Sequence, residues 1–342
     1  MVNWGLIGCG DISNKRVAPA IKSQPQSRLL AAMSPYKSEL DSFGEKYNVQ
    51  KKYLELDSML QDKEIDAVYI ATPIFLHYEP ALKALKSGKH VLVEKPMALT
   101  NQECEVLIKE AEKQNATLGV AYFRRFFPKL KEVKRIINEG IIGDIIQIRI
   151  LYHTWYNPDR SDPKAWRVEK AKAGGGPLWD MGSHKFDLMV DLVGMPESVC
   201  SIATTQTHCY EVEDSCSVIM EMENKAHCLA SFNWNSRLWS DEFEILGTLG
   251  RIKLAPCDSE NIEVQLNPKI LKGLGKEITN TMIPNHQNVH YPVIDDFVNA
   301  VLEGREPVVS GKEGYKTNKI LSAVEQAART GGKVKVDETQ CA

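Results

Sequence analysis

Two widely separated segments of the chain carry residues of the types that proton transfer needs. The tripeptide Glu94-Lys95-Pro96 ends an apolar run, and a glycine cluster much further along leads into Asp180 and His184. A lysine at the carboxyl edge of a parallel sheet can reach a hydroxyl group lying on a bound cofactor. The i, i+4 spacing of Asp180 and His184 puts a carboxylate and an imidazole on one helical face, where they can relay a proton. The pattern therefore predicts a nicotinamide-dependent redox site with Lys95, His184 and Asp180 as its catalytic residues.

Each of these residues also has a structural interpretation. Pro96 is typical of a surface turn, in which Lys95 would be solvated. Asp180 follows glycines and a proline, where a helix N-cap belongs. His184 could be a core histidine, or a metal ligand together with Asp180 and Asp187. We expect no metal, because hydride transfer assisted by a lysine needs no Lewis acid.

The composition is that of an ordinary globular chain with two domains. Of the 342 residues, 43% are hydrophobic and 25% are charged, and the formal net charge is −3. Neither a nucleic acid nor a membrane is therefore an expected partner, and the apolar start at Val2–Ile7 is too short for a signal peptide. Alternating patterns around Cys209, Cys216 and Cys228 favour buried, reduced thiols over a metal site. We expect a cytoplasmic protein that binds small molecules.

The first third of the chain alternates short β-rich runs with helical patterns, which is typical of βαβ units and a parallel sheet. We expect an α/β Rossmann domain with a doubly wound sheet over residues 1–123, which binds a dinucleotide. The strands are expected at Trp4–Ile7, Leu29–Met33, Ala67–Ala71, His90–Val93 and Thr117–Ala121, and the helices at Ser38–Tyr47, His77–Lys86 and Asn101–Gln114.

Beyond Phe123 the pattern changes, and residues 124–342 are expected to form an α+β domain for substrate binding and oligomerisation. Successive alternating segments are typical of a large, mostly antiparallel, open sheet with helices on one face. The open face predicts a homodimer or homotetramer that forms through this C-terminal sheet. The helices are expected at Pro128–Asn138, Asp180–Val193 and Val293–Leu302, and the strands at Asp144–Trp155, Val199–Thr207, Ser215–Met222, Ala226–Trp234 and Glu242–Leu246.

A phosphate-binding turn is predicted at residues 8–13, between the first expected strand and a helix. Gly8 and Gly10 allow a tight turn and a close backbone approach to a pyrophosphate, whose charge would be met by the helix N-terminus at Asp11 and Ile12. Ser13 replaces the usual third glycine or alanine. The alternative is an ordinary β-to-α turn.

The end of the second expected strand indicates which dinucleotide is preferred. A carboxylate there would accept the ribose 2′-hydroxyl of NAD, but the chain has Ser34, Pro35, Tyr36 and Lys37. Ser34 and Lys37 would instead hold a 2′-phosphate, so the sequence predicts NADP, with NAD as the alternative. Otherwise Lys37 merely begins a solvated helix.

The order of these features resembles the Gfo/Idh/MocA oxidoreductases, and the similarity runs nearly end to end. The matching residues are Gly8-x-Gly10, Asp66-Ala67-Val68 through Ala71-Thr72-Pro73 to His77, Gly88-Lys89-His90-Val91 into Glu94-Lys95-Pro96, Tyr122 with Arg125, and Gly174-Gly175-Gly176 through Asp180 and Gly182 to His184 and Asp187. Within the family, the Ser34/Lys37 region and the Trp166-Arg167 segment are most similar to NADP-dependent 1,5-anhydro-D-fructose reductases and to dihydrodiol dehydrogenases.

The resemblance implies roles for individual residues. Lys95 would bind the reacting oxygen, His184 would be the acid/base, and Asp180 would orient or charge the imidazole. The Lys95-Pro96 bond would be cis, and the segment at His290 and Tyr291 would return near the cofactor. Cofactor contacts would come from Gly8, Gly10, Asp11, Ile12, Ser34, Lys37, Ala71, Thr72, Pro73, His77, Glu94, Lys95, Trp166 and Arg167, and substrate contacts from Tyr122, Arg125, Trp155, Tyr156 and His184.

Some of the substrate contacts also have plainer explanations. The loop expected from Tyr152 to Arg167 carries Trp155, Tyr156 and Trp166, whose aromatic faces suit the C–H faces of a sugar, a cyclic polyol or an aromatic diol. Core filling under a long connection is the alternative. Arg125 follows Arg124 in a basic run at a helix entrance, which explains it as well as a substrate contact does.

Together these features predict a NAD(P)-dependent sugar dehydrogenase or reductase that prefers NADP. It would transfer a hydride between the nicotinamide and a carbonyl or secondary alcohol of a sugar, polyol or related cyclic compound. The alternatives are an NAD-dependent glycosidase of the same fold without net redox, and a cofactor-sensing regulator without catalysis.

Overall fold

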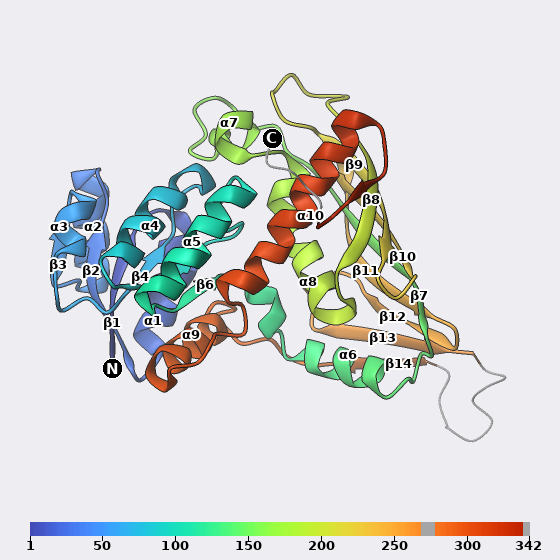
Figure 1. The fold of residues 1–342 in the computed structure, drawn as a ribbon, viewed down its shortest axis with the longest axis horizontal. Helices are drawn as coiled ribbons and strands as arrows, with labels where there is room; N and C mark the ends of the chain where they lie inside the picture. The colour runs from blue at the N-terminus through green and yellow to red at the C-terminus, as the bar shows by residue number, and fades with distance from the viewer. Residues whose placement is uncertain (268–277, 338–342) are drawn as a thin grey trace. The chain divides into compact units, whose positions relative to one another are not determined.

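The computed structural model of the protein describes residues 1–267 and 278–337, and the chain divides into two compact units (Figure 1). The first unit comprises Met1–Phe126 and His286–Asn318, and the second comprises Phe127–Asn285 and Lys319–Ala342. The sequence pattern placed the boundary after residue 123 and kept 124–342 together. In the structure, His286–Asn318 belongs to the first unit instead.

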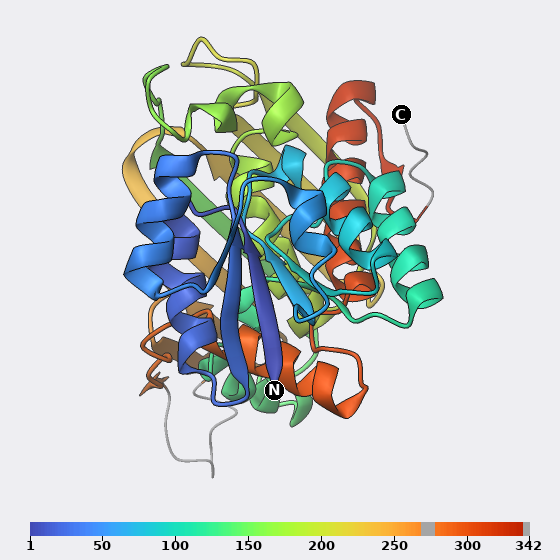
Figure 2. The ribbon, with the colours of Figure 1, turned by 90° about the vertical axis from the view of Figure 1, so that its left-hand side faces the viewer.

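The first unit is built on a six-stranded parallel sheet with the strand order β3-β2-β1-β4-β5-β6 (Figure 2). The order reverses beside β1, which is the arrangement of a doubly wound Rossmann fold and confirms the predicted α/β class. The strands are β1 (Val2–Ile7), β2 (Ser27–Met33), β3 (Lys51–Tyr53), β4 (Ala67–Ile70), β5 (His90–Val93) and β6 (Leu118–Val120).

Helices cover both faces of this sheet, and each face has its own buried apolar cluster. Helices α3, α4 and α5 contribute to one cluster, and α1, α2 and α9 contribute to the other. Phe297 of α9 packs against Trp4 of β1 with a ring centroid distance of 5.4 Å, so burial of its apolar face draws α9 to the first unit. The helical segments are η1 (Ser13–Val17), α1 (Ala18–Ser23), α2 (Lys37–Tyr47), α3 (Leu56–Leu60), η2 (Ile74–Leu76), α4 (Tyr78–Lys86), α5 (Asn101–Gln114), η3 (Phe123–Phe126) and α9 (Tyr291–Glu303).

The second unit is built on a nine-stranded sheet with the order β14-β13-β12-β11-β7-β10-β9-β8-β15. All neighbouring strands are antiparallel except β7 and β10, which are parallel, so the predicted mostly antiparallel sheet is confirmed. The strands are β7 (Ile145–Trp155), β8 (Pro196–Thr204), β9 (Ser215–Met222), β10 (His227–Asn233), β11 (Asn235–Gly247), β12 (Gly250–Leu254), β13 (Asn261–Leu266), β14 (Ile278–Met282) and β15 (Val334–Lys335).

The two faces of this sheet differ in exposure, because side chains alternate along each strand. Ile148, Val218 and Phe243 are buried on one face. Ile202 and Ile219 point to the other face and are 69% and 57% exposed. The helical segments of this unit are α6 (Lys129–Asn138), η4 (Ala165–Val168), α7 (Lys170–Ala173), η5 (Leu178–Gly182) and α8 (Ser183–Val193), and α10 (Gly311–Thr330) has residues in both units.

Several predicted elements are longer or begin elsewhere in the structure. The helix predicted from Asp180 begins at Leu178 as the π-helical turn η5 and continues as α8. The strand predicted at Glu242–Leu246 is the end of the longer β11. Among the described residues, no helix is long and apolar enough to cross a membrane.

Candidate active site

Four strands of the parallel sheet end at one edge and gather the predicted cofactor residues there. β1, β2, β4 and β5 run parallel, so Gly8, Ser34, Ala71 and Glu94 follow their carboxyl ends. Dinucleotides bind at this edge of a doubly wound sheet, beside the point where the strand order reverses. The first unit therefore contains the candidate cofactor site.

The glycine turn after β1 has room for a ligand. Gly8 has a φ of +93°, and a Cβ there would lie 3.1 Å from the carbonyl oxygen of Ala71. The Ser13 hydroxyl donates to the Gly8 carbonyl at 2.6 Å, so the residue in place of the third glycine closes the turn. A Cβ at Gly10 would meet no atom within 4 Å. The turn therefore fits the close approach of a dinucleotide pyrophosphate.

The helix after this turn starts at Asp11 and Ile12. The Asp11 carboxylate lies 2.8 Å from the Lys15 ammonium, and both side chains are exposed. The Asn14 side-chain amide donates to the carbonyl oxygens of Cys9 at 2.9 Å and Gly10 at 3.1 Å. The turn is thus fixed by side chains from its own helix.

The residues predicted to hold a 2′-phosphate have protein partners in the structure. The buried Ser34 hydroxyl donates to the Glu39 carboxylate at 2.6 Å, and the exposed Lys37 ammonium lies 2.9 Å from Asp41. A carboxylate therefore does stand beside the end of β2. The sequence pattern missed Glu39 because it lies on the following helix rather than directly after the strand.

His77 links the loops that follow β4 and β5. Its ring nitrogens lie 2.9 Å from the carbonyl oxygen of Pro96 and 2.9 Å from that of Thr72, and the side chain is 1% exposed. Burial lowers the pKa of His77 despite these carbonyl neighbours. The Lys95-Pro96 peptide bond is cis, as predicted. Ala71 and Pro73 flank Thr72 in the same loop, so His77 holds the main chain on which the predicted cofactor residues lie.

Glu94 lies at the centre of a buried polar group. The Tyr69 hydroxyl donates to Glu94 Oε1 at 2.8 Å, and His290 Nε2 lies 3.5 Å from the same oxygen. Burial opposes ionisation of Glu94, but its hydrogen bonds with His290 and Tyr69 and the charge of Lys95 hold the pKa below its usual value. Tyr69 was not predicted, because a tyrosine in an apolar strand reads as core.

Tyr122 and Arg125 are both buried in the first unit. Tyr122 is fully buried and belongs to the apolar cluster on one face of the sheet. The Arg125 guanidinium lies 3.1 Å from the Glu313 carboxylate, and α10 supplies that glutamate. A substrate contact by either residue stays a prediction.

The second unit supplies Asp180, His184 and the Trp166-Arg167 segment. Asp180 lies inside the turn η5, whose N-cap is Pro177, so the capping interpretation of Asp180 does not hold. The Arg167 guanidinium lies 3.6 Å from the Asp180 carboxylate and 5.7 Å from the centre of the Trp166 ring. The Asp180 charge raises the pKa of Arg167. His184 is buried on the first turn of α8, with 4% of its surface exposed.

The glycine cluster before η5 is tightly packed. A Cβ at Gly174 would lie 2.8 Å from the Trp179 ring, and one at Gly176 would overlap the main-chain carbonyl oxygen of Glu213. The Gly176 N–H donates to the Glu213 carboxylate at 2.9 Å. These glycines therefore allow close packing in front of the helix that carries Asp180.

The predicted aromatic residues Trp155 and Tyr156 are part of a larger ring cluster. Arg237 lies over the Trp155 ring at 4.0 Å, and His208 meets its edge at 4.7 Å. The Tyr156 ring lies 4.6 Å from Trp234. One face of Trp155 is therefore already covered by a cation.

Within residues 1–267 and 278–337, no group of three or more His, Cys, Asp or Glu residues could hold a metal ion. Burial raises the pKa of the Cys228 thiol to about 12. Cys216 is also buried, whereas Cys209 is exposed. The prediction of buried thiols is therefore confirmed for Cys216 and Cys228 and is wrong for Cys209.

The reversing parallel sheet, the open glycine turn and the lysine that follows β5 define the class of a Rossmann-fold oxidoreductase that binds NAD(P). The sequence matches two family models: "Oxidoreductase family, NAD-binding Rossmann fold" over residues 2–122 and "GFO/IDH/MocA C-terminal domain" over residues 130–253. The chain belongs to the GFO/IDH/MocA oxidoreductase family, which confirms the resemblance seen in the sequence.

Two relatives and one solved structure that are similar to this chain are named as dehydrogenases or reductases. The chain is 31% identical to trans-1,2-dihydrobenzene-1,2-diol dehydrogenase of Xenopus laevis over 255 residues, which cover 73% of this chain and 74% of the relative. It is 26% identical to 1,5-anhydro-D-fructose reductase of Ensifer adhaerens over 341 residues, which cover 98% and 99%. The solved structure of levoglucosan dehydrogenase in complex with NADH has the same fold, with a TM-score of 0.89, 24% identity and coverage of 98% and 99%. The protein is thus an NAD(P)-dependent oxidoreductase of the dehydrogenase/reductase type.

Proposed function

We propose that this oxidoreductase is a cytoplasmic, NADP-preferring enzyme that transfers a hydride between nicotinamide and a carbonyl or secondary alcohol of a sugar, polyol or related cyclic compound. The observation that carries the proposal is the position of Lys95. Lys95 follows β5 at the same sheet edge as the open turn at Gly10, and its peptide bond to Pro96 is cis. The aromatic cluster around Trp155 and the names of the relatives support a cyclic substrate.

Lys95 acts on the reacting oxygen in this proposal. The nicotinamide, when bound, supplies or accepts the hydride. During reduction the carbonyl carbon gains the hydride, and the Lys95 ammonium gives a proton to the developing oxyanion and becomes a neutral amine. His184, charged or oriented by Asp180, is the second acid/base. The Arg167 guanidinium lies 3.6 Å from the Asp180 carboxylate and partly offsets its negative charge.

Replacement of Lys95 tests the catalytic assignment. Lys95→Met is expected to lower kcat by roughly 10²- to 10⁴-fold, the usual contribution of a general acid, while the Kd for NADPH changes little. The substrate for this assay is first identified by screening ketoses, inositols and dihydrodiols, with nicotinamide absorbance as the readout. Lys86→Met, on the exposed surface of α4, is the matched control and should keep full activity.

The other outcomes of this assay separate the alternative functions. Cleavage of a glycoside without net change in nicotinamide absorbance would indicate a glycosidase with no net redox. Cofactor binding without turnover of any substrate would indicate a regulator. Full activity of Lys95→Met would contradict the proposed role of Lys95.

The preference for NADP depends on Lys37 in this proposal. Its ammonium is exposed and pairs with the surface carboxylate of Asp41, a contact that a 2′-phosphate would replace. Lys37→Met is expected to weaken NADPH binding about tenfold, or about 1.4 kcal/mol, and to leave NADH binding unchanged. Tighter binding of NADH than NADPH by the wild type would contradict the preference, and Glu39 would then be the group that meets the ribose.

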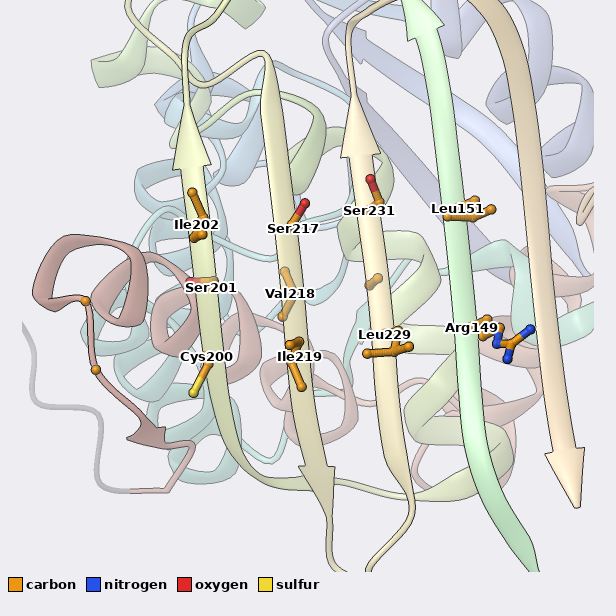
Figure 3. Close-up of a pocket in the computed structure, with 13 residues that line it drawn as sticks. Arg149, Leu151, Cys200, Ser201, Ile202, Ser217, Val218, Ile219, Leu229 and Ser231 are labelled. Atoms are coloured by element: carbon orange, nitrogen blue, oxygen red, sulfur yellow. The ribbon is translucent and has the colours of Figure 1, made fainter. Parts of the chain in front are cut away.

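We also propose that a second copy of the chain covers the open face of the antiparallel sheet. Ile219 and Leu229 lie side by side on β9 and β10, and Ile202 lies on β8 beside Ser217 (Figure 3). All three apolar side chains line a groove of about 510 Å³. Large exposed apolar patches of this kind favour association. Ile219→Asp is expected to convert a homodimer or homotetramer to a smaller species in light scattering, whereas a monomeric wild type would contradict the proposal.

A further inference from the structure

Both carboxylate oxygens of Glu94 are engaged by groups of the first unit. The fully buried Tyr69 donates to Oε1 at 2.8 Å, and His290, which is 3% exposed, places Nε2 3.5 Å from the same oxygen. The second oxygen, Oε2, accepts the main-chain N–H of Lys95 at 3.3 Å. The carboxylate is therefore directed toward protein groups, where the sequence pattern predicted a contact with the cofactor.

The surroundings of His290 indicate that its ring is held in place to contact Glu94. A carboxylate only accepts hydrogen bonds, so the proton of a neutral His290 must be on Nε2. Its Nδ1 is buried and has no hydrogen-bond partner among the described residues, and the ring stacks on Phe123 at 4.8 Å. His77, in contrast, has a backbone carbonyl at each ring nitrogen. His77 thus connects two loops, whereas the polar contact of His290 is to Glu94.

Glu94 directly precedes Lys95, the residue proposed to transfer the proton, and accepts a hydrogen bond from its main-chain N–H. Burial opposes that charge, yet the pKa of Glu94 stays below its usual value because His290, Tyr69 and Lys95 favour the ionised form. An opposite charge nearby favours the ammonium form of a lysine. The charge of Glu94 also opposes the lowering of the His77 pKa by burial. Glu94 therefore influences both Lys95 and His77 electrostatically.

We propose that Glu94 is a positioning residue that keeps Lys95 in its charged, proton-donating form, and that Tyr69 and His290 hold the Glu94 carboxylate in place for this purpose. The inference rests on the proposed role of Lys95 and assigns its supporting residues. The segment that returns to the first unit, His286–Asn318, delivers one of them.

The pH profile of carbonyl reduction tests this inference. Glu94→Gln keeps the shape of the side chain and removes its charge, so the ammonium form of Lys95 is lost at a lower pH. The basic limb of the kcat profile is expected to move down by about one pH unit. The Kd for NADPH should stay within about twofold of wild type, because in this inference the Glu94 carboxylate contacts protein groups rather than the cofactor. His290→Gln should move the limb in the same direction by less. His286→Gln, an exposed histidine on the same segment, is the control and should leave the limb in place.

The outcomes distinguish this inference from the proposed function. An unmoved basic limb in both Glu94→Gln and His290→Gln overturns the inference. Weaker NADPH binding by Glu94→Gln with an unmoved limb makes Glu94 a cofactor contact and also overturns it. Full activity of Lys95→Met would instead remove the proposed function, whereas an inactive Lys95→Met beside unmoved limbs would remove only the inference. If Glu94→Gln does not fold, His290→Gln alone decides.

Discussion

Glycine is concentrated at residues 8–10 and again at residues 174–176, and the surroundings of the two clusters differ. A Cβ at Gly10 would meet no atom within 4 Å, whereas one at Gly174 would lie 2.8 Å from the Trp179 ring and one at Gly176 would overlap the Glu213 carbonyl. Glycine therefore leaves an open space at Gly10 in the first unit. At Gly174 and Gly176 in the second unit it instead allows neighbouring groups to pack closely. The difference shows that a glycine cluster indicates a ligand only where its missing side chains leave a space.

The largest effect is expected from Gly176→Ala. The added methyl group must displace the main chain at Glu213, because backbone atoms have no rotamer to adjust, and overpacking of this kind costs about 2 to 3 kcal/mol. Urea unfolding measures the loss. Gly332→Ala, whose Cβ would meet its nearest atom at 3.9 Å, is the control and should stay within about 0.5 kcal/mol of wild type. Equal stability of the two variants would mean that the main chain at Glu213 does not restrict position 176.

A smaller effect, on binding rather than on folding, is expected from Gly10→Ala. Its methyl group enters the space left for the pyrophosphate, so the Kd for NADPH should rise about tenfold, or about 1.4 kcal/mol. The unfolding free energy should not change, since no protein atom is displaced. Calorimetric titration and urea unfolding check the two halves of this prediction. An unchanged Kd would show that the cofactor does not approach this turn.

The smallest effect concerns Glu213, the partner of the packed cluster. Burial raises the pKa of its carboxyl above the usual value, although the N–H of Gly176 opposes the shift. The folded state thus holds this proton more tightly than the unfolded state does. The stabilisation is complete below the unfolded pKa of about 4.3 and is lost as the pH rises through the folded value.

Glu213→Gln removes this titration, so the variant should not share the pH dependence that Glu213 gives to the stability of the wild type. The unfolding free energy of Glu213→Gln relative to wild type should improve as the pH rises from acid to neutral, because only the wild type loses the stabilisation of a protonated Glu213 over that range. Urea unfolding over a series of pH values measures the trend. Parallel curves for the two proteins would show that Glu213 does not titrate differently on folding.

The parallel sheet could be predicted because its signals are local. Thr100 and Glu103 form a capping box at the start of α5, and Asn115 ends the helix in the left-handed conformation, so the predicted and observed bounds agree. The twenty residues of α10 escaped prediction, and the return of the α9 segment was implied by the family resemblance alone. Both depend on contacts between distant segments, such as Phe297 on Trp4, which no local period records.

The candidate site was predictable only in part, for the same reason. The pattern of types and spacings pointed to Gly8, Gly10 and Lys95 because each follows a strand at the sheet edge. Tyr69 and His290 were not predicted to join Glu94, since that contact joins residues far apart in the chain. The pairing of Arg167 with Asp180 likewise arises from the packing of the second unit.

The first unit is formed by two separate stretches of the chain, which affects how it can fold during translation. Trp4 leaves the ribosome long before Phe297, which packs on it, so the sheet of the nascent chain has an uncovered apolar surface while residues 127–285 of the second unit are being translated. Exposed surface of this kind attracts chaperones and promotes aggregation. The order of folding for this unit cannot follow the order of its synthesis, and translation that stops before α9 would release a Rossmann sheet that lacks both part of its cover and His290.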